Sequence, residues 1–564
     1  MDFKTVIAEK ISPLAGLSQA EVLEMIEIPP NPEMGDYAFP CFKLAKQMRK
    51  SPQMIATDIA EKLERPDFLN QVVPVGGYVN FFIDKAIFAE EVLEAIRREG
   101  EHYGSSREGE GKTICIDYSS INIAKPFHIG HLSSTAIGNA LYKIYEFLGY
   151  KCVGINHLGD WGTQFGKLIA AYKKWGDKQK VEEESINGLL QLYVKFHEEA
   201  EKDPSLEDEG RLWFKKIEDG DEEALSIFNW FKEITLKEVQ KVYDLLGVQF
   251  DSYAGESFYN GKIDRVVEEL RQKGLLKESQ GAYVVDLEEY NLPPCLILKS
   301  DGASLYATRD IAAALYRKDT YNFHKCLYVV AYEQNLHFQQ WFKVIELMGY
   351  DWAKDLVHVA FGMVSMEDGA LSTRKGKVVF LEDVLNRAIE KTLELIEEKS
   401  PDLENKEEVA KKVGIGAVIF NDLSNNRIKD IVFSWDRMLN FDGETGPYVQ
   451  YTHARSCSVL ARAELDLAGE VDYHHLTDQE AQETIRLLEQ FPGVVREACH
   501  RNEPSLITRH VVDIAQAFNK FYYEHRILDE DPKVQKARLV LVDAVRTVIK
   551  TGLGLLGIEA PERM

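Results

Sequence analysis

The sequence predicts a multidomain α/β protein, in which a parallel-sheet domain is preceded by a smaller α+β module and followed by a helical module. The length of 564 residues is that of three or four domains. From Lys112 onward apolar strands alternate with helices, in the order 114–118, 131–148 and 152–156, which is typical of a parallel sheet. Beyond about residue 381, apolar residues keep helical spacing nearly to the end.

Residues 1–107 are expected to form the N-terminal α+β module. Apolar residues keep helical spacing over 7–14 and 54–63, and a strand is expected over 78–83 after a turn rich in glycine and proline. The polar run 104–111 has the composition of a linker. The module is therefore predicted to end near residue 107.

Residues 108–380 are expected to hold the parallel sheet, and residues 381–564 the helical module. Long, charged, amphipathic helices interrupt the sheet pattern over about 170–250, so this stretch is predicted to be a helical insertion. Strand patterns resume at 283–286 and 327–331. Because ligands of parallel sheets bind beyond the carboxyl ends of the strands, the functional site is expected where the first strand of the sheet ends.

The composition is that of a globular protein without a membrane segment. Hydrophobic residues make up 45% and charged residues 28%, and no apolar run reaches membrane-spanning length. The seven cysteines include no Cys-x-x-Cys pair, so we expect no disulfide framework, no zinc site and a cytoplasmic location. The net charge of −25 lowers the expectation of a nucleic-acid partner without removing it, because a polyanion responds to the local field of a groove.

The most informative segment is Lys125-Pro-Phe-His-Ile-Gly-His131, between a predicted strand and a predicted helix. His128 and His131 share one face of the helix start, from which both can donate hydrogen bonds to phosphate. Gly130 has no Cβ, so a flat ring can lie against the backbone, and the free N–H groups of the helix start add positive partial charge. The segment therefore predicts an ATP site for nucleotidyl transfer.

Three other interpretations of this region are weaker. The two histidines could hold a metal, but no third ligand stands at a suitable spacing. They could merely cap a helix or pack, which the adjacent Lys125-Pro126 and the preceding strand disfavour. The run Gly109–Thr113 resembles the end of a phosphate-binding P-loop, yet Ser106 replaces its first glycine and the run precedes its strand.

A second phosphate-binding element is expected in the cationic segment Leu371–Lys377. A charge run is usually a solvated surface, but together with the two histidines this one is a natural source of positive charge for a departing pyrophosphate. The candidate residues are Ser372, Arg374, Lys375 and Lys377.

Across nearly its whole length the chain resembles the class I aminoacyl-tRNA synthetases, and among them the arginyl-tRNA synthetase family. His128–His131 resembles the HIGH sequence of the class, and Leu371–Lys375 resembles its KMSKS loop. Four further blocks resemble the arginine enzymes alone and stand in order along the chain, at 119–128, 156–166, 306–310 and 446–455.

The sequence departs from the family pattern at four positions. Ala370 and Thr373 stand where the KMSKS lysines would be, so Lys125 or the later cations of the loop would act in their place. Asp117 replaces a glutamate, and Ile121 replaces a proline. The shorter carboxylate arm of Asp117 would change how that position contacts the substrate.

The resemblance implies a Rossmann-type catalytic domain with a helical insertion, an N-terminal tRNA-binding domain and an all-α C-terminal anticodon-binding domain. It implies an arginine–tRNA ligase that activates L-arginine with ATP and Mg²⁺ and transfers it to the terminal ribose of tRNA(Arg), with activation expected only when tRNA is present. A monomer is expected, without a tightly bound metal or organic cofactor and without a membrane partner.

The resemblance also implies roles for single residues. Catalysis would involve Lys125, His128, His131, Arg374, Lys375 and Lys377, and ATP would be bound by His128, Gly130, His131 and Ser372. Arginine would be held by Asp310, the leading partner of its guanidinium, and by Asp117, Asn122, Tyr306 and Gln334. Tyr78 and Asn80 would contact the D-loop of the tRNA. Asp310 could instead form an ion pair within the protein, and Tyr78 could belong to the core.

Two alternative functions remain at this point. A class I enzyme that charges cysteine or glutamate is disfavoured by the absence of a zinc-ligand cysteine set and by the pair of Tyr306 and Asp310. A catalytically inactive tRNA-binding paralogue would explain the altered loop, but the intact His128 and His131 disfavour it.

Overall fold

The computed structural model describes residues 2–300, 305–367, 379–463 and 465–564. These residues form two compact units. Unit 1 consists of Met1–Tyr103, Ser456–Gln490 and Gln516–Val548, and unit 2 of Gly104–Arg455, Phe491–Ala515 and Ile549–Met564. Each unit is described by itself below.

A four-stranded parallel sheet lies at the centre of unit 2. Its strands are β4 (Thr113–Asp117), β5 (Lys151–Ile155), β9 (Lys325–Ala331) and β10 (Leu356–Phe361), in the order β10-β9-β4-β5. Most of their side chains are buried, as expected for a sheet that helices cover on both faces. The parallel sheet predicted from the sequence is confirmed, and β10 is a strand that the sequence pattern did not reveal.

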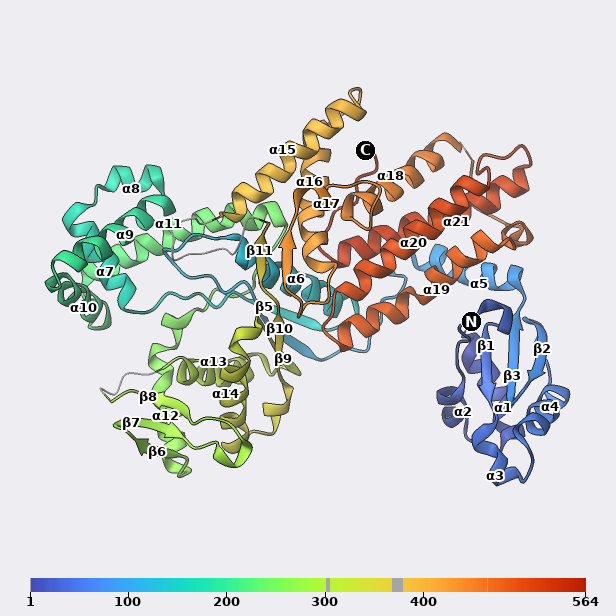
Figure 1. The fold of residues 1–564 in the computed structure, drawn as a ribbon, viewed down its shortest axis with the longest axis horizontal. Coiled ribbons are helices and arrows are strands. Elements are labelled where there is room, and N and C mark those ends of the chain that lie inside the picture. Colours follow the sequence, from blue (N-terminus) through green and yellow to red (C-terminus); the bar gives the residue numbers. More distant parts are fainter. Residues whose placement is uncertain (1, 301–304, 368–378, 464) are drawn as a thin grey trace. The chain divides into compact units, whose positions relative to one another are not determined.

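Three helices connect these strands and position the site (Figure 1). Helix α6 (Leu132–Phe147) joins β4 to β5, α13 (Tyr306–Tyr321) leads into β9, and α14 (Asn335–Leu347) joins β9 to β10. The side chains of Phe323, Tyr328 and Trp341 fill the core against α13 and α14. Because the strands are parallel, β4, β5 and β9 end at the same edge of the sheet, and the segments that follow them meet there.

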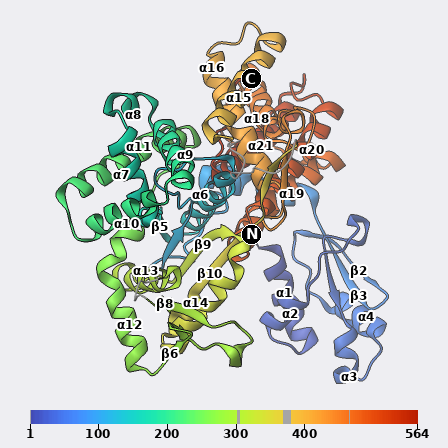
Figure 2. The ribbon, with the colours of Figure 1, turned by 60° about the vertical axis from the view of Figure 1, so that its left-hand side comes forward.

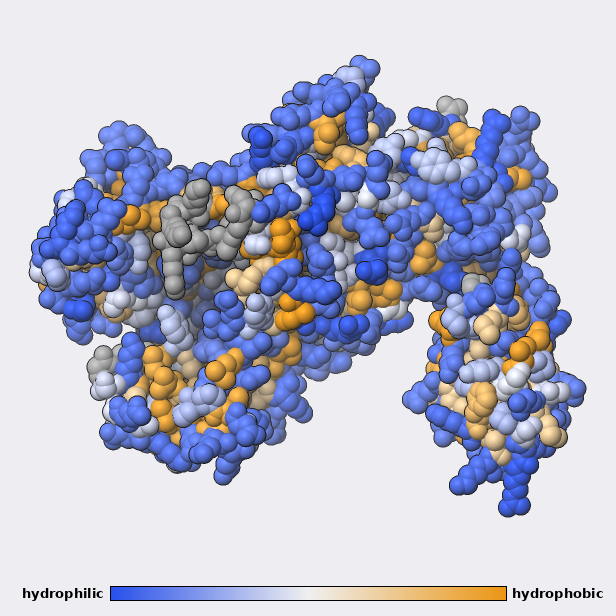
Figure 3. Space-filling view, in the orientation of Figure 1, coloured by the Kyte–Doolittle hydropathy of each residue, from blue (hydrophilic) through white to orange (hydrophobic). Residues whose placement is uncertain are grey.

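Five helices form the predicted insertion after β5. They are α7 (Thr163–Trp175), α8 (Lys178–Glu184), α9 (Ile186–Lys202), α10 (Ser205–Glu218) and α11 (Glu222–Leu246), and they lie together in Figure 2. At the left of Figure 3 their outer surface is mostly hydrophilic. Within the part of the chain that the structure describes, none of the helices is both long and apolar enough to span a membrane.

The strand predicted at 283–286 exists but belongs to a separate sheet. It is β7 (Ala282–Val285), which pairs antiparallel with β6 (Leu276–Ser279) and β8 (Cys295–Leu298) after helix α12 (Ile263–Gln272). Gln280 and Gly281 have φ of 51° and 80°, so a tight two-residue turn returns the chain beside β6. Because both neighbours of β7 are antiparallel to it in this separate sheet, the expectation that this strand continues the parallel sheet was wrong.

The first three helices after residue 379 belong to unit 2. They are α15 (Leu381–Lys399), α16 (Lys406–Leu423) and α17 (Trp435–Met438). Between them β12 (Ile431–Phe433) pairs in parallel with β11 (Val364–Met366), an exception to the helical character expected for this region. The domain boundary at residue 381 stays a prediction.

In unit 1 the N-terminal residues form a three-stranded antiparallel sheet with helices. The strands β1 (Tyr37–Pro40), β2 (Leu69–Val75) and β3 (Tyr78–Ile83) are ordered β1-β3-β2. The helices of this part are α1 (Phe3–Ala15), α2 (Gln19–Met25), α3 (Ala45–Met48), α4 (Pro52–Lys62) and α5 (Lys85–Glu99). The expected helix over 54–63 and strand over 78–83 are thus confirmed as α4 and β3.

Four helices complete the chain and contribute residues to both units. They are α18 (Gly446–Ala463), α19 (Gln479–His500), α20 (Ser505–Glu524) and α21 (Pro532–Leu555). Together they account for the helical C-terminal part that the sequence predicted.

A buried carboxyl group joins α16 to α6, the helix that follows the two histidines. Ser133 Oγ of α6 donates a 2.7 Å hydrogen bond to Oδ1 of Asp422 on α16. Oδ2 of Asp422 has no hydrogen-bond partner among the described residues. Burial raises the pKa of Asp422 to about 7, although the Ser133 hydrogen bond opposes the shift.

We expect Asp422→Asn to stabilise the protein, and to do so more strongly at pH 8 than at pH 5. Because the pKa of Asp422 is raised on folding, the folded state keeps a proton that the unfolded state releases, and the free energy of unfolding falls as pH rises from about 4 to 7. The upper limit of this loss is about 4 kcal/mol. Melting temperatures at pH 5 and pH 8 test it, and an equal difference between variant and wild type at both pH values would contradict it.

Candidate active site

The histidine segment forms the start of the helix that joins β4 to β5. His128 precedes a single 3₁₀ turn, Ile129–His131, which runs directly into α6. The N–H of Gly130 donates to Nδ1 of His128 at 3.0 Å, and the N–H of His128 donates to Nδ1 of His131 at 3.2 Å. The two ring centroids are 4.1 Å apart. A Cβ on Gly130 would lie 2.8 Å from Cε1 of His128, so the flat ring against this glycine is that of His128 itself.

Both imidazoles are neutral at neutral pH. Burial is the main reason that the pKa of His131 is lowered to about 3. Repulsion from His128, were that ring also protonated, adds to the shift. Burial and the nearby Lys125 also lower the pKa of His128. Nδ1 of His131 lies near both the backbone N–H of His128 and, at 3.3 Å, its carbonyl oxygen. Because the backbone N–H can only donate, we assign Nδ1 of His131 as the acceptor. Each ring therefore carries its proton on Nε2 and offers one N–H donor.

A cavity of about 270 Å³ opens beside these rings. Its walls are Asn122, Ile123, Ala124, Lys125, Pro126, His128, His131, Gln164, Phe165, Leu168, Leu190 and Tyr193. The structure thus brings Asn122, Lys125 and the two histidines around one space. Gln164 at the start of α7 and Tyr193 on α9 were not proposed as site residues from the sequence, although Gln164 lies inside the block 156–166.

The cationic segment 371–377 lies outside the described residues, and so do the expected roles of Ser372, Arg374, Lys375 and Lys377. The first described residues after it dock on the histidine segment. Ile129 N–H donates to the carbonyl oxygen of Val379 at 3.0 Å, and Leu381 N–H donates to that of Phe127 at 2.9 Å. In the sequence Val379 stands two positions after Lys377. The described chain therefore resumes, at Val379, directly beside the histidine segment.

Asp310 lies within α13, one turn after Tyr306, as the sequence predicted. Its Oδ2 is 2.6 Å from Nε2 of His337 on α14, and both side chains are partly exposed. Arg309 does not pair with Asp310, because its Nη1 donates to the carbonyl oxygen of Glu256 at 2.9 Å and to Asn260 Oδ1 at 2.6 Å. Among the described contacts of Asp310, the side chain is engaged through Oδ2.

Glu256 is a second carboxylate near Asp310 that sequence reasoning missed. Burial raises the pKa of Glu256 to about 7, Arg309 opposes the shift, and the negative charges of Asp310 and Asp160 add to it. Asp160 is fully buried and accepts hydrogen bonds from Ser257, N–H at 2.8 Å and Oγ at 2.6 Å. Asp160, within the block 156–166, thus fixes the segment that carries Glu256. The spacing of residues in the sequence does not reveal this contact between the two segments.

Asp117 ends β4 as expected, but its carboxylate already has a partner within the protein. Oδ2 of Asp117 lies 2.9 Å from Nη1 of the buried Arg317. The expectation that Asp117 assists Asp310 in holding a substrate guanidinium therefore meets an obstacle, because the guanidinium of Arg317 occupies that carboxylate.

The remaining candidates for arginine binding differ in exposure. Asn122 is exposed, and its backbone pairs with Gly159 in a parallel bridge after β4 and β5. Gln334 is exposed in the 3₁₀ turn Tyr332–Gln334 that follows β9. Tyr306 is 71% exposed at the start of α13. Asn122 and Gln334 thus follow adjacent strands at the same edge of the sheet.

Tyr78 and Asn80 belong to unit 1 and point to the same side of β3. The ring of Tyr78 is half-buried and meets the ring of Phe42 edge to face, with 5.2 Å between centroids. Asn80 is only 6% exposed. Their expected contact with tRNA stays a prediction.

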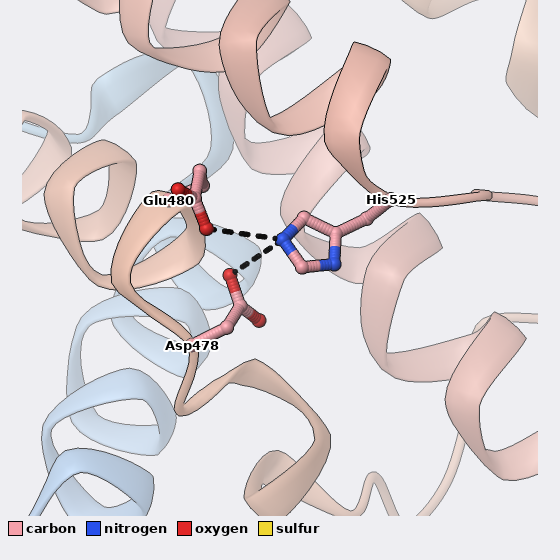
Figure 4. Close-up of side chains that lie close together, drawn as sticks. All are labelled: Asp478, Glu480 and His525. Carbon is pink, nitrogen blue, oxygen red and sulfur yellow. Dashed lines mark hydrogen bonds and ion pairs between the residues drawn. The ribbon is translucent and has the colours of Figure 1, made fainter.

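A separate cluster of ionisable side chains lies in unit 1 (Figure 4). Nε2 of His525 is 3.2 Å from Oδ1 of Asp478 and 3.2 Å from Oε2 of Glu480. The N–H of Ala481 also donates to Oδ1 of Asp478 at 2.8 Å, and Nζ of Lys520 lies 3.7 Å from Oε1 of Glu480. Ion pairs and a helix cap account for this cluster, and we assign no metal to it.

Comparisons with known proteins agree with this geometry. The family model described as tRNA synthetases class I (R), catalytic domain, matches residues 92–435. An arginyl tRNA synthetase N terminal domain matches residues 1–83, and a DALR anticodon binding domain matches residues 449–564.

Relatives that match this chain over its full length are arginine–tRNA ligases. The arginine–tRNA ligase of Alkaliphilus metalliredigens is 61% identical over 564 residues, and that of Clostridioides difficile is 58% identical, each match covering 100% of both chains. The solved arginyl-tRNA synthetase of Thermus thermophilus superposes with a TM-score of 0.82 at 26% identity, also over 100% of both chains.

Proposed function

Since the chain belongs to the arginyl-tRNA synthetase family of class I enzymes, and is therefore an arginine–tRNA ligase, we propose how its residues carry out the two steps of that reaction. In the first step the carboxylate of L-arginine attacks the α-phosphorus of ATP and pyrophosphate leaves. In the second, the terminal ribose hydroxyl of tRNA takes the arginyl group from the adenylate.

ATP is assigned to the histidine segment. The Nε2–H groups of His128 and His131 donate to the phosphates. Because both rings are neutral, the positive charge that balances the phosphates comes from Lys125 beside them. Gly130 keeps the ring of His128 against the helix start. The docking of Val379 on Ile129 supports a role for Arg374, Lys375 and Lys377 at the pyrophosphate and for Ser372 in ATP binding, with Mg²⁺ carried by the nucleotide.

L-Arginine is assigned to the edge of the sheet where β4, β5 and β9 end. Asp310 takes the guanidinium, assisted by Glu256, and His337 orients the Asp310 carboxylate. Tyr306 covers the side chain, while Asn122 and Gln334 hold the ammonium and carboxylate groups. A planar guanidinium has five N–H donors in a fixed fork, and two carboxylates can accept from that fork. The ammonium of lysine lacks the fork and therefore fits the same two carboxylates less well.

For tRNA(Arg), we propose that Tyr78 and Asn80 contact the D-loop and that the helical C-terminal part reads the anticodon. The domains assigned to these roles are 1–107, 108–380 and 381–564, with the insertion at about 170–250. We further propose that the enzyme acts in the cytoplasm as a monomer and that arginine is activated only when tRNA is bound. The three family models, which match in this order along the chain, support the arrangement.

The observation that carries the proposal is the convergence of the histidine segment and the carboxylates on one edge of the parallel sheet. Pyrophosphate exchange into ATP tests it, with each amino acid in turn and with or without tRNA. Of the amino acids tested, we expect only L-arginine to support exchange, and only when tRNA is present. Exchange with lysine would contradict the arginine pocket, and no exchange by the folded protein under any condition would leave a tRNA-binding paralogue.

A further inference from the structure

Arg317 is a fully buried arginine directly behind the proposed arginine site. Its side chain is 1% exposed. It lies on α13 seven residues after Asp310, so the two side chains leave the same face of the helix two turns apart. A buried guanidinium is costly unless partners satisfy its charge, and those partners therefore show what it does.

The guanidinium lies among three elements of unit 2. Its Nη1 is 2.9 Å from Oδ2 of Asp117 on β4, an ion-pair distance at which the N–H is not aligned for a hydrogen bond. Its Nη2 is 3.4 Å from Nδ1 of His157, and its Cζ is 5.5 Å from the ring centroid of Tyr328. Although burial lowers it, the Asp117 carboxylate raises the pKa of Arg317 well above its usual value, so the charge persists.

His157 must be neutral at this contact. An arginine has only donors, so Nδ1 of His157 accepts and its proton lies on Nε2. Burial lowers the pKa of His157, which agrees with a neutral ring. Asp117 is thus left as the single negative partner of Arg317 among the described contacts.

The other oxygen of Asp117 holds a strained backbone. Oδ1 accepts a 2.6 Å hydrogen bond from Oγ of Ser120. Ser119, Ser120 and Ala124 have φ of 67°, 46° and 59°. These are left-handed backbone conformations, which residues other than glycine adopt rarely. Such residues cost about 1 kcal/mol or more each and persist only where their surroundings fix them. Asn122 lies inside this segment and lines the cavity.

We propose that Arg317 is a positioning residue for arginine binding, which clamps Asp117 and, through Ser120, holds the segment 119–124 so that Asn122 faces the substrate. The clamp also withdraws Asp117 from the acidic pocket, so the substrate guanidinium meets Asp310 and not a competing carboxylate. The inference rests on the proposed role of Asn122 in binding L-arginine.

The test compares Arg317→Met, which keeps the volume but not the charge, with Arg317→Lys, which keeps the charge. KM for arginine and for ATP are measured in aminoacylation, together with the melting temperature. In Arg317→Met we expect KM for arginine to rise about tenfold or more, and by a clearly larger factor than KM for ATP. Arg317→Lys should stay closer to wild type than Arg317→Met, whereas a side chain that merely fills space predicts the reverse order.

The double variant Asp117→Asn, Arg317→Met covers the case in which Arg317→Met does not fold. Removing both charges leaves no unpaired buried carboxylate, so this variant should fold, and its KM for arginine should still be raised because the clamp is absent. A matched control is Arg427→Met in the same unit, a partly buried arginine whose Nε donates to the carbonyl oxygen of Asn502 at 3.0 Å. It should change stability without changing the ratio of the two KM values.

A folded Arg317→Met or double variant with an unchanged KM for arginine, or with equal changes for both substrates, would overturn the inference. This result differs from a failure of the proposed function, in which the wild-type protein itself would not activate arginine.

Discussion

Replacing His131 by alanine is expected to slow arginine-dependent pyrophosphate exchange by a factor of about 10² to 10³, because a preorganised donor to the charge that builds on the phosphates is lost. The donor is the Nε2–H of a neutral ring held at the start of α6. Its Nδ1 also accepts the N–H of His128, so the substitution further loosens the first histidine. The loss should appear in kcat at saturating arginine and ATP.

The pH dependence of this effect follows from the pKa of His131. Because burial lowers that pKa to about 3, the ring stays neutral from pH 6 to pH 8, and the ratio of wild-type to variant rates should be constant across this range. A ratio that grows toward pH 6 would mean that the imidazolium form acts. His324→Ala serves as the control, since this histidine is exposed in the same unit and only stacks on Tyr150, with 6.3 Å between ring centroids.

Asp310→Ala is expected to raise KM for arginine by about 10² or more while leaving KM for ATP within about twofold, because truncating one partner of a charge-assisted pair costs about 2–5 kcal/mol. The variant removes the carboxylate that contacts His337 and that we propose binds the substrate guanidinium. ATP affinity should persist because the histidine cavity does not include Asp310 among its walls. Exchange kinetics at varied arginine, with ATP binding measured separately, give both quantities.

Asp319→Ala is a matched control for Asp310→Ala. Asp319 lies on the same helix, is largely exposed, and pairs with the exposed Arg265 at 2.6 Å. Exposed pairs contribute little, so arginine KM should not change. If Asp310→Ala binds arginine as well as Asp319→Ala does, Asp310 is not part of the pocket.

Local patterns in the sequence were sufficient for the core of the fold and for the position of the two histidines at a helix start. The apolar run at β4, followed by two histidines and a helical pattern, predicted a strand, a helix start and a phosphate site, because all three depend on residues close together in the chain. Asn122 and Gln334 came from the family resemblance alone, and the structure places them after adjacent strands at one edge of the sheet.

Contacts between distant segments could not be predicted in this way. The pair of Asp117 and Arg317 joins β4 to α13, and no pattern in either segment indicates the other. Glu256 comes close to Asp310 only because Asp160 fixes the neighbouring Ser257. Likewise β12 is three residues long and becomes a strand only by pairing with β11.

The central claim is that the histidine segment and Asp310 bind the two ends of one arginyl-adenylate. A crystal structure with arginyl-sulfamoyl-adenosine, a non-hydrolysable analogue of that intermediate, tests it most directly. The account predicts the guanidinium within hydrogen-bond distance of Asp310, with the sulfamate and adenosine against His128, Gly130 and His131. A guanidinium bound elsewhere, or an adenosine remote from the two histidines, would contradict it.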